Sequence, residues 1–556
     1  MKYERPNIEE HNEWMKKKLE ELKDSKNVEE FMPIFNEINK KREHIMTMST
    51  LAQVRHTINT VDEFYDAEND FWDEKLPELQ VYEVEFVEIA VKKDFREELL
   101  KEIPETFFKL GECAMKSFDK KIVPLLVEEN KLSSEYGKLR ASCKVEFDGE
   151  IMNLAQIGAK CESIDRDTRK RAYDAKMSFF EEHEDEFDEI YDKMVRVRTQ
   201  MAHELGYDNF IELGYYRMNR LDYNADMVAN YRKQILEYVT PLCIKLYAKQ
   251  QKRLGLETLT YYDMPVFFKD GNAIPKGTPD DLVGYAKTMY HEMSKETGEF
   301  IDMMIENELW DLVSRPNKQM GGYMTEIPEY KVPFIFSNFN GTSGDVDVLT
   351  HEAGHAFQYY LSKDIKVPDV TAPTLESCEI HSMSMEFFAY PWMNLFFREE
   401  ENRYKYSHMA HSILFLPYGV LVDHFQHEVY AHPEMGKEER KACWRNLERQ
   451  YQPAKNFDGC DLLERGGWWY QQGHIFEMPF YYIDYTLAQV CAQQFFVRSY
   501  NKDPETWNDY IKICKLGGTK SFTNLVKAAG LKVPFEDGCI EGIVPILEEY
   551  LNSFDM

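Results

Sequence analysis

The sequence contains no run of about 18 apolar residues, so no membrane-spanning helix is expected. Its first residues, MKYERPNIEEHNEWMKKKLEELKD, are charged throughout and lack the apolar core of a signal peptide. None of the ten cysteines belongs to a CxxC pair, and their spacing is irregular. We therefore expect a cytoplasmic protein whose cysteines are reduced thiols, most of them buried.

Positive charge is also scarce. Lys and Arg together number 67 against 98 Asp and Glu, so the formal net charge is −31. A chain this acidic repels phosphate backbones and anionic membranes, which argues against nucleic acid or a membrane as a partner. The ordinary interpretation of the charge is a solvated acidic surface, although an acidic cleft would also attract cationic ligands.

Helical spacing of apolar residues dominates the 556-residue chain. The pattern begins near residue 10, resumes near residue 165 after a break, and returns from residue 376 to the end. We expect interruptions of the last stretch near Pro391, Pro417, Pro453 and Pro479. Neither an internal repeat nor a low-complexity linker is present. Because this length exceeds one hydrophobic core, we expect two lobes.

Two segments are typical of β-structure. Asp148-Gly149 lies between KVEF and EIMN, which predicts a hairpin. The segment YKVPFIFSNFN, residues 330–340, predicts a strand. Because Pro333 cannot donate to a ladder, we expect this strand at a sheet edge. The expected fold class is mainly α with a small β-sheet.

His351, Glu352 and His355 form the pattern HExxH. On a helix the positions i and i+4 share a face, so both imidazoles can reach one Zn²⁺ at about 2.0–2.1 Å. Glu352 then projects beside the metal, where it can accept a proton from a water that the metal acidifies. Composition alone predicts roughly 0.07 chance matches, so the surrounding residues must decide. The metzincin class is excluded because Gln358 and Leu361 stand where it requires glycine and histidine.

Three surrounding features support a metal site. Residues 341–345, GTSGD, precede the motif and supply candidate N-caps for its helix. Two small residues inside the motif, Ala353 and Gly354, would let another element approach the metal. A carboxylate, Glu379, follows the second motif histidine by 24 residues, and Glu386 lies two helical turns further on. Two histidines and a glutamate form a catalytic zinc set with an open fourth position, and Glu386 can orient one of the ligands.

The run FSNFNGTSGDVDVLTHEAGHAFQ, followed by EIHSMSMEFF, resembles the thimet-oligopeptidase-like metallopeptidases, and within them the oligoendopeptidase F branch. The third zinc ligand of that family opens a Glu-x-x-Ser-x-x-x-Glu pattern, which here is Glu379, Ser382 and Glu386. The resemblance therefore implies one Zn²⁺ per chain, held by His351, His355 and Glu379.

A later segment, GHIFEMPFYYIDYTLAQV, resembles the family segment in which a histidine is followed by tyrosines that close over the substrate. His474 matches the histidine, and Tyr482 and Tyr485 match two tyrosines spaced three apart, with Tyr481 as the nearest competitor. Thimet oligopeptidase itself has a glycine-rich stretch where this chain has residues 475–479, with a one-residue change in length. The resemblance implies that His474, Tyr482 and Tyr485 donate hydrogen bonds to the substrate carbonyl or its oxyanion.

The resemblance at the level of motifs covers roughly residues 320–500 and implies a mostly helical, two-lobed body with a deep substrate channel. We place an N-terminal helical lobe at residues 1–200 and a catalytic lobe at residues 201–556. The expected function is zinc-dependent cleavage of internal peptide bonds in short, unstructured oligopeptides. An edge strand at residues 334–340, directly before the zinc helix, could align an extended peptide by main-chain hydrogen bonds.

Two alternatives remain. Related family members include peptidyl-dipeptidases and carboxypeptidases, but no residue in the sequence identifies the cation that would hold a free C-terminal carboxylate. A different class of function is a helical peptide-binding scaffold with a vestigial zinc site, against which the complete set of His351, Glu352, His355 and Glu379 argues.

Overall fold

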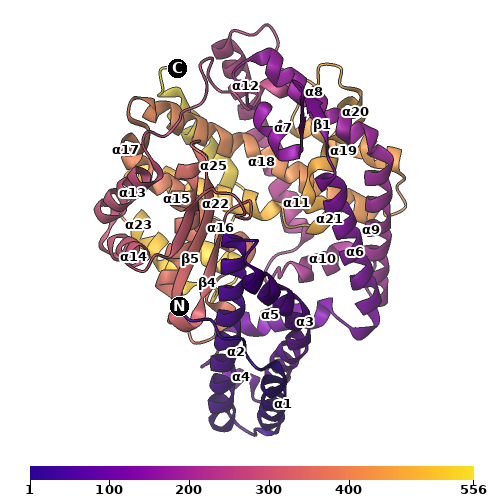
Figure 1. Cartoon of the computed structure of the whole chain (residues 1–556), viewed down its shortest axis with the longest axis vertical. Helices are drawn as coiled ribbons and strands as arrows, with labels where there is room; N and C mark the ends of the chain where they lie inside the picture. The colour runs from indigo at the N-terminus through magenta and orange to yellow at the C-terminus, as the bar shows by residue number, and fades with distance from the viewer. The chain divides into compact units, whose positions relative to one another are not determined.

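The fold is described from a computed structural model that covers all 556 residues. The chain forms two compact units, each assembled from three separate stretches. Unit 1 comprises Met1–Met115, Ala273–Glu401 and Cys491–Val533, and unit 2 comprises Lys116–Asn272, Asn402–Val490 and Pro534–Met556. Both units are mostly helical (Figure 1), which confirms the expected mainly α class with small sheets. None of the helices is both long enough and apolar enough to cross a membrane.

Unit 1 contains the N-terminal helices, a three-stranded sheet and the helices that follow it. Its elements are α1 Ile8–Asp24, α2 Val28–Ile58, α3 Glu63–Val91, α4 Arg96–Leu99, α5 Glu105–Ser117, α13 Pro279–Met293, α14 Lys295–Glu306, β3 Trp310–Val313, β4 Tyr323–Ile327, β5 Val332–Phe339, α15 Gly344–Ser362, α16 Leu375–Phe388, α17 Met393–Phe397, α23 Thr506–Leu516 and α24 Phe522–Ala528. The last residues of α5 belong to unit 2.

Unit 2 is helical apart from one hairpin. Its elements are α6 Val123–Ala141, β1 Val145–Phe147, β2 Glu150–Met152, α7 Leu154–Lys160, α8 Arg166–Glu182, α9 Glu184–Glu204, α10 Phe210–Arg217, α11 Ala225–Gln234, α12 Thr240–Leu254, α18 Glu401–Ala431, α19 Lys437–Tyr451, α20 Asp461–Arg465, α21 Gly473–Glu477 and α25 Cys539–Asn552. Helix α22, Ile483–Tyr500, contributes residues to both units. The lobe boundary near residue 200 stays a prediction, and α9 runs through that position.

The indigo helices α1, α2 and α3 pack side by side (Figure 1). Asn7, Asn27 and Asp62 cap their N-termini by accepting backbone N–H groups of the first turn. Their apolar stripes meet in a core that also takes in Val367 and Val370, from the segment after α15. These helices therefore pack against the segment between α15 and α16.

The sheet of unit 1 has the order β3-β5-β4, with β5 parallel to β3 and antiparallel to β4. The predicted strand is present, but its expected edge position is wrong because β5 is central. The N–H of Ile335 bonds to Leu309 on the β3 side, so the N–H that Pro333 lacks would have pointed to the same side. Pairing with β3 starts only at Ile335, and the proline therefore costs no ladder bond. Both sides of β5 are paired at Ile335 and Phe336, so these two residues offer no free ladder edge to a peptide.

The hairpin is confirmed. Val145–Phe147 pairs with Glu150–Met152, and the two turn residues Asp148 and Gly149 have φ of 51° and 85°. Positive φ at both positions matches the two-residue turn that an Asp-Gly dipeptide favours.

The expected interruption at Pro417 is wrong, because α18 continues through it from Glu401 to Ala431. A proline at this position removes the helical hydrogen bond to the carbonyl of Ile413. The thiol of Cys243 lies 3.7 Å from that carbonyl oxygen and donates to it instead. A neighbouring helix thus supplies a hydrogen bond in place of the one that the proline removes. The residue pattern along a single helix cannot reveal such a contact.

Candidate metal centre and aromatic cluster

Helix α15 carries the HExxH residues. It begins at Gly344, and its N-cap residue Ser343 makes no side-chain cap. The carboxylate of Asp345 reaches back instead and accepts the N–H groups of Asn340 and Gly341, each at 2.8 Å. The sequence therefore placed the helix start correctly within residues 341–345, but the expected side-chain cap is absent. These contacts fix the turn that joins β5 to the helix.

Three donor groups meet in unit 1. The Nε2 atoms of His351 and His355 lie 3.3 and 3.5 Å from Oε2 of Glu379, which α16 supplies. Donor atoms bound to one Zn²⁺ at about 2.0–2.1 Å in a tetrahedron are separated by about 3.3–3.4 Å. The chain has a single group of three His, Cys, Asp or Glu side chains able to share an ion, and it is this one. The residues present therefore fit a metal ion held by two imidazoles and one carboxylate.

The helices α15 and α16 approach each other closely because Gly354 has no side chain. A Cβ at this position would lie 2.7 Å from Cα of Ser382 and 2.8 Å from the carbonyl oxygen of His381. Both contacts are with the backbone of α16, which cannot yield by a change of rotamer. The structure thus confirms that a small residue inside the motif lets another element approach, and that element is the helix carrying Glu379.

Further groups on α16 orient these donors. Nδ1 of His351 lies 2.6 Å from Oε1 of Glu386, and the hydroxyl of Ser382 donates to Oε2 of Glu379 at 3.0 Å. Burial opposes a charge on His351, yet its bonds to Glu379 and Glu386 outweigh burial and raise its pKa well above the usual value. Burial likewise opposes the charge on Glu379, but the two histidines hold its pKa well below the usual value. An anionic carboxylate is the form that a metal ion requires.

Glu352 lies beside these donors in sequence but makes no hydrogen bond or ion pair of its own. Its side chain is half-buried on α15, one residue after His351. The carboxylate is therefore free to bind a water molecule or a substrate group.

The other predicted residues cluster in unit 2. The ring centroid of His474 lies 5.6 Å from that of Tyr481, 4.9 Å from that of Tyr482 and 6.0 Å from that of Tyr485. All four side chains are half-buried. Because Tyr481 and Tyr482 both contact the histidine and Tyr485, ring packing does not favour one of them over the other.

The segment that carries this cluster is anchored by buried groups. Arg198 donates to the carbonyls of Ile475 and Phe476, and its partner carboxylate is Glu129 at 2.6 Å. Phe480 has a φ of 68°, which is strained for a bulky residue. Its ring lies against Gly214, where a Cβ would be 2.5 Å from Cδ2 of the ring. Three residues of the segment, Ile475, Phe476 and Phe480, are thus held by contacts with residues far away in sequence.

Sequence reasoning missed a polar chain that ends at His474. The hydroxyl of Tyr418, on α18, donates to Oε1 of Gln472 at 2.7 Å. The amide nitrogen of Gln472 lies 2.8 Å from Nδ1 of His474. Gln472 precedes the histidine by two residues, but no spacing rule marks a glutamine there, and Tyr418 is 56 residues away in a helix that reads as core.

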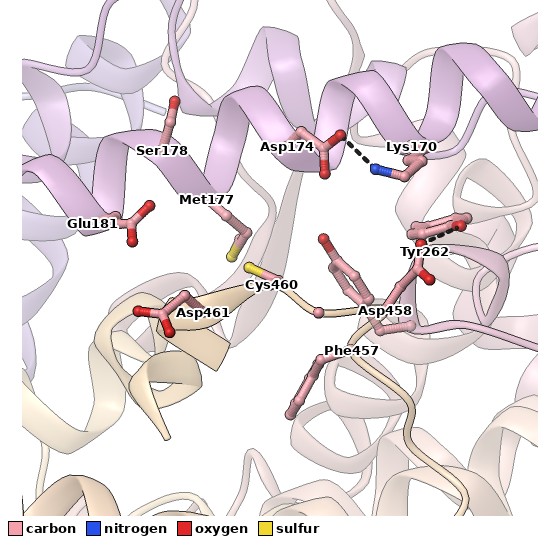
Figure 2. Close-up of a pocket in the computed structure, with 12 residues that line it drawn as sticks. Lys170, Asp174, Met177, Ser178, Glu181, Tyr262, Phe457, Asp458, Cys460 and Asp461 are labelled. Carbon is pink, nitrogen blue, oxygen red and sulfur yellow. Dashed lines mark hydrogen bonds and ion pairs between the residues drawn. The ribbon is translucent and has the colours of Figure 1, made fainter. Parts of the chain in front are cut away.

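Unit 2 also has a pocket of about 270 Å³ between α8 and the loop that leads to α20 (Figure 2). Within it Lys170 pairs with Asp174 at 2.8 Å, and Tyr262 donates to Asp458 at 3.0 Å. Its lining contains no histidine and no group of three side chains able to share a metal ion. The pocket therefore does not repeat the set of metal donors found in unit 1.

Comparison with known proteins agrees with this geometry. Residues 160–544 match the pattern of peptidase family M3, and residues 1–118 match the peptidase M3 N-terminal domain. The structure described as "PZ peptidase A with inhibitor 2" shares 51% identity at a TM-score of 0.92, covering 100% of this chain and 99% of that chain. A putative oligoendopeptidase F from Bacillus anthracis str. Ames shares 47% identity at a TM-score of 0.87, covering 100% and 98%. Another putative oligoendopeptidase F shares 49% identity at 0.92, also covering 100% and 98%. A comparison with curated proteins gave no match.

Proposed function

The chain belongs to peptidase family M3 and is a metallopeptidase, and from this premise we propose that it is a zinc-dependent endopeptidase of short, unstructured oligopeptides. The observation that carries the proposal is the meeting of the His351, His355 and Glu379 donor atoms within 4.8 Å of one another, beside a free Glu352. Two imidazoles and one carboxylate are the ligand set of a catalytic zinc with an open position.

In this proposal His351, His355 and Glu379 hold the metal, and Glu386 fixes which nitrogen of His351 faces it. When bound, zinc supplies a Lewis acid that polarises the scissile carbonyl and lowers the pKa of water. Glu352 accepts a proton from the water as the new C–O bond forms, and it passes this proton to the amine as the C–N bond then breaks. The free carboxylate of Glu352 is suited to both transfers.

Hydrolysis of a peptide bond also develops negative charge on the carbonyl oxygen. We assign His474, Tyr482 and Tyr485 as neutral donors to the substrate carbonyl or its oxyanion. Burial, followed by the nearby charge of Arg140, lowers the pKa of His474, so its imidazole is neutral near pH 7. Burial raises the pKa of Tyr482 well above the usual value, so its phenol keeps its proton.

The test of the metal and base roles is Glu352→Gln, which preserves the shape of the side chain. This variant should retain one zinc per chain by elemental analysis and the melting temperature of the parent. Its kcat/KM on a quenched peptide should fall by at least about 10². Glu379→Gln serves as the control that should lose zinc as well as activity. Near-normal turnover by Glu352→Gln would refute the base, and a zinc-replete preparation without zinc would refute the metal.

For the alternative activity, removal of C-terminal dipeptides, the candidate that we consider is Arg140. Arg140 is half-buried near His474 and forms no ion pair, and its Nε has no hydrogen-bond partner. Such a guanidinium could hold a free C-terminal carboxylate. Matched peptides ending in a carboxylate or an amide distinguish the activities. Equal cleavage rates for the two peptides indicate endopeptidase action. Slower cleavage of the amidated peptide, with no such difference in Arg140→Gln, indicates removal of C-terminal dipeptides.

A further inference from the structure

The polar chain from Tyr418 to His474 has a definite direction of donation. Burial raises the pKa of Tyr418 well above its usual value, so the phenol keeps its proton. The Trp468 side chain opposes this rise, as expected of an indole N–H facing the phenol oxygen. Tyr418 therefore gives its own proton to Oε1 of Gln472, at 2.7 Å. This contact fixes which end of the Gln472 amide faces the histidine.

The orientation of the amide decides the tautomer of His474. The group facing Nδ1, at 2.8 Å, is the amide NH₂, which can donate but cannot accept. Nδ1 must therefore be the acceptor, and in the neutral ring the single proton lies on Nε2. The other groups around the ring are Arg140 and the phenols of Tyr481, Tyr482 and Tyr485, so no carboxylate among them competes for the Nδ1 position.

We propose that Gln472, oriented by Tyr418, is a positioning residue that holds His474 as the Nε2–H tautomer and so makes it a hydrogen-bond donor to the substrate. This inference rests on the substrate role proposed for His474. Without the amide, the Nδ1–H form would present a lone pair to a carbonyl oxygen, which repels it instead of stabilising it.

A purely structural role for Gln472 predicts something different. Its backbone N–H bonds to the carbonyl of Trp469, and its own carbonyl accepts the N–H of Ile475. These two bonds shape the turn before α21 and do not involve the side chain. Side-chain variants of Gln472 therefore leave the turn in place and change only the partner of Nδ1.

The decisive variant is Gln472→Glu. A carboxylate at this position accepts the Nδ1 proton, so neutral His474 has a bare Nε2 and only its imidazolium can donate from Nε2. We expect kcat to fall as the pH rises through the pKa of His474, an alkaline limb that the parent lacks. At the high-pH plateau the loss should approach that of His474→Ala, with KM and zinc content little changed. Gln472→Met, which allows both tautomers, should lower kcat by less than about tenfold without a new limb.

The matched control is Gln471→Glu, which makes the same change of charge one residue earlier. Gln471 accepts from Lys176 at 2.9 Å, whereas the hydrogen bond to His474 Nδ1 comes from Gln472, so the pH profile of Gln471→Glu should match that of the parent. The second readout is a double-mutant cycle in which Gln472→Glu is added to His474→Ala. If Gln472 acts through the histidine, adding Gln472→Glu to His474→Ala should not lower kcat any further.

The outcomes separate the two proposals. Full kcat in His474→Ala would refute the substrate role of His474. A large loss in His474→Ala, together with a parental pH profile in Gln472→Glu, would refute only the tautomer assignment. A Gln472→Glu loss that persists undiminished in the His474→Ala background would likewise overturn it, because the glutamine would then act elsewhere.

Discussion

Replacing Gly354 by alanine should damage the metal centre through the contact between α15 and α16. The added Cβ would lie 2.7 Å from Cα of Ser382, whereas real Cβ atoms stay beyond 3.0 Å and ordinary contacts begin at 3.4 Å. The two backbones must therefore separate by at least 0.3 Å, and by 0.7 Å to reach an ordinary contact. Metal–ligand distances tolerate deviations of only about 0.2 Å. The histidines lie on one helix and Glu379 on the other, so zinc affinity should fall by at least about tenfold. Overpacking should also lower the free energy of unfolding of the metal-free protein by about 1–3 kcal/mol.

Competition with a zinc chelator measures the affinity, and denaturant unfolding of the metal-free protein measures the stability. The control is Gly284→Ala, on α13 of the same unit, where an added Cβ meets nothing within 4 Å. That change should leave zinc affinity unaltered and increase stability by about 0.5–1 kcal/mol, because alanine is the better helix former. Parental zinc affinity in Gly354→Ala would refute the argument that helix separation sets the ligand geometry.

Three further predictions follow from other parts of the molecule. Tyr485→Phe removes only a hydroxyl and should lower kcat more than it raises KM in steady-state assays; a change in KM alone would make Tyr485 a binding contact. Burial opposes the charge on Glu129, but Arg198 and Arg217 outweigh it and lower its pKa from 4.5 to about 2. Its stabilising contribution is thus complete above pH 4.5 and lost as the pH falls toward 2, so Glu129→Gln should flatten the stability–pH curve there and lower the free energy of unfolding near pH 7 by about 3–5 kcal/mol. An unchanged acid slope by denaturant unfolding would contradict this. Finally, the enzyme should cleave short peptides and spare casein; rapid casein degradation, with no fall in rate as peptides lengthen, would exclude the enclosed channel that the family resemblance implies.

The sequence predicted best what lies along a single helix. His351 and His355 are placed on one face by their spacing alone, and the structure brings Glu379, identified from the family pattern, to the same point. The errors arose where a neighbouring element decides. Pro333 is tolerated in a central strand because the pairing with β3 begins only after it, at Ile335. Helix α18 continues through Pro417, and Cys243 on another helix donates to the carbonyl that the proline leaves without its helical partner. Long-range contacts of this kind leave no periodic signal.

The polar chain to His474 was missed for a related reason. Tyr418 and Gln472 meet only because the chain brings the segment before α21 back to α18. In the sequence, Tyr418 is typical of a core residue and Gln472 of a turn residue. A motif identifies the residues that carry the chemistry. The residues that orient them are brought into contact by tertiary packing, which a motif does not record.

The interleaved composition of unit 1 has a consequence for how the protein is made. A ribosome releases the chain from the N-terminus, yet this unit needs Cys491–Val533 as well as the first 115 residues. The hydroxyl of Thr106, for example, bonds to the carbonyl of Gly518, more than 400 positions later. The helices α15 and α16, which carry the candidate metal ligands, therefore emerge from the ribosome long before the unit that holds them can be completed. During synthesis they must remain partly unburied until nearly the whole chain has emerged, and no contiguous fragment of the chain contains unit 1 alone.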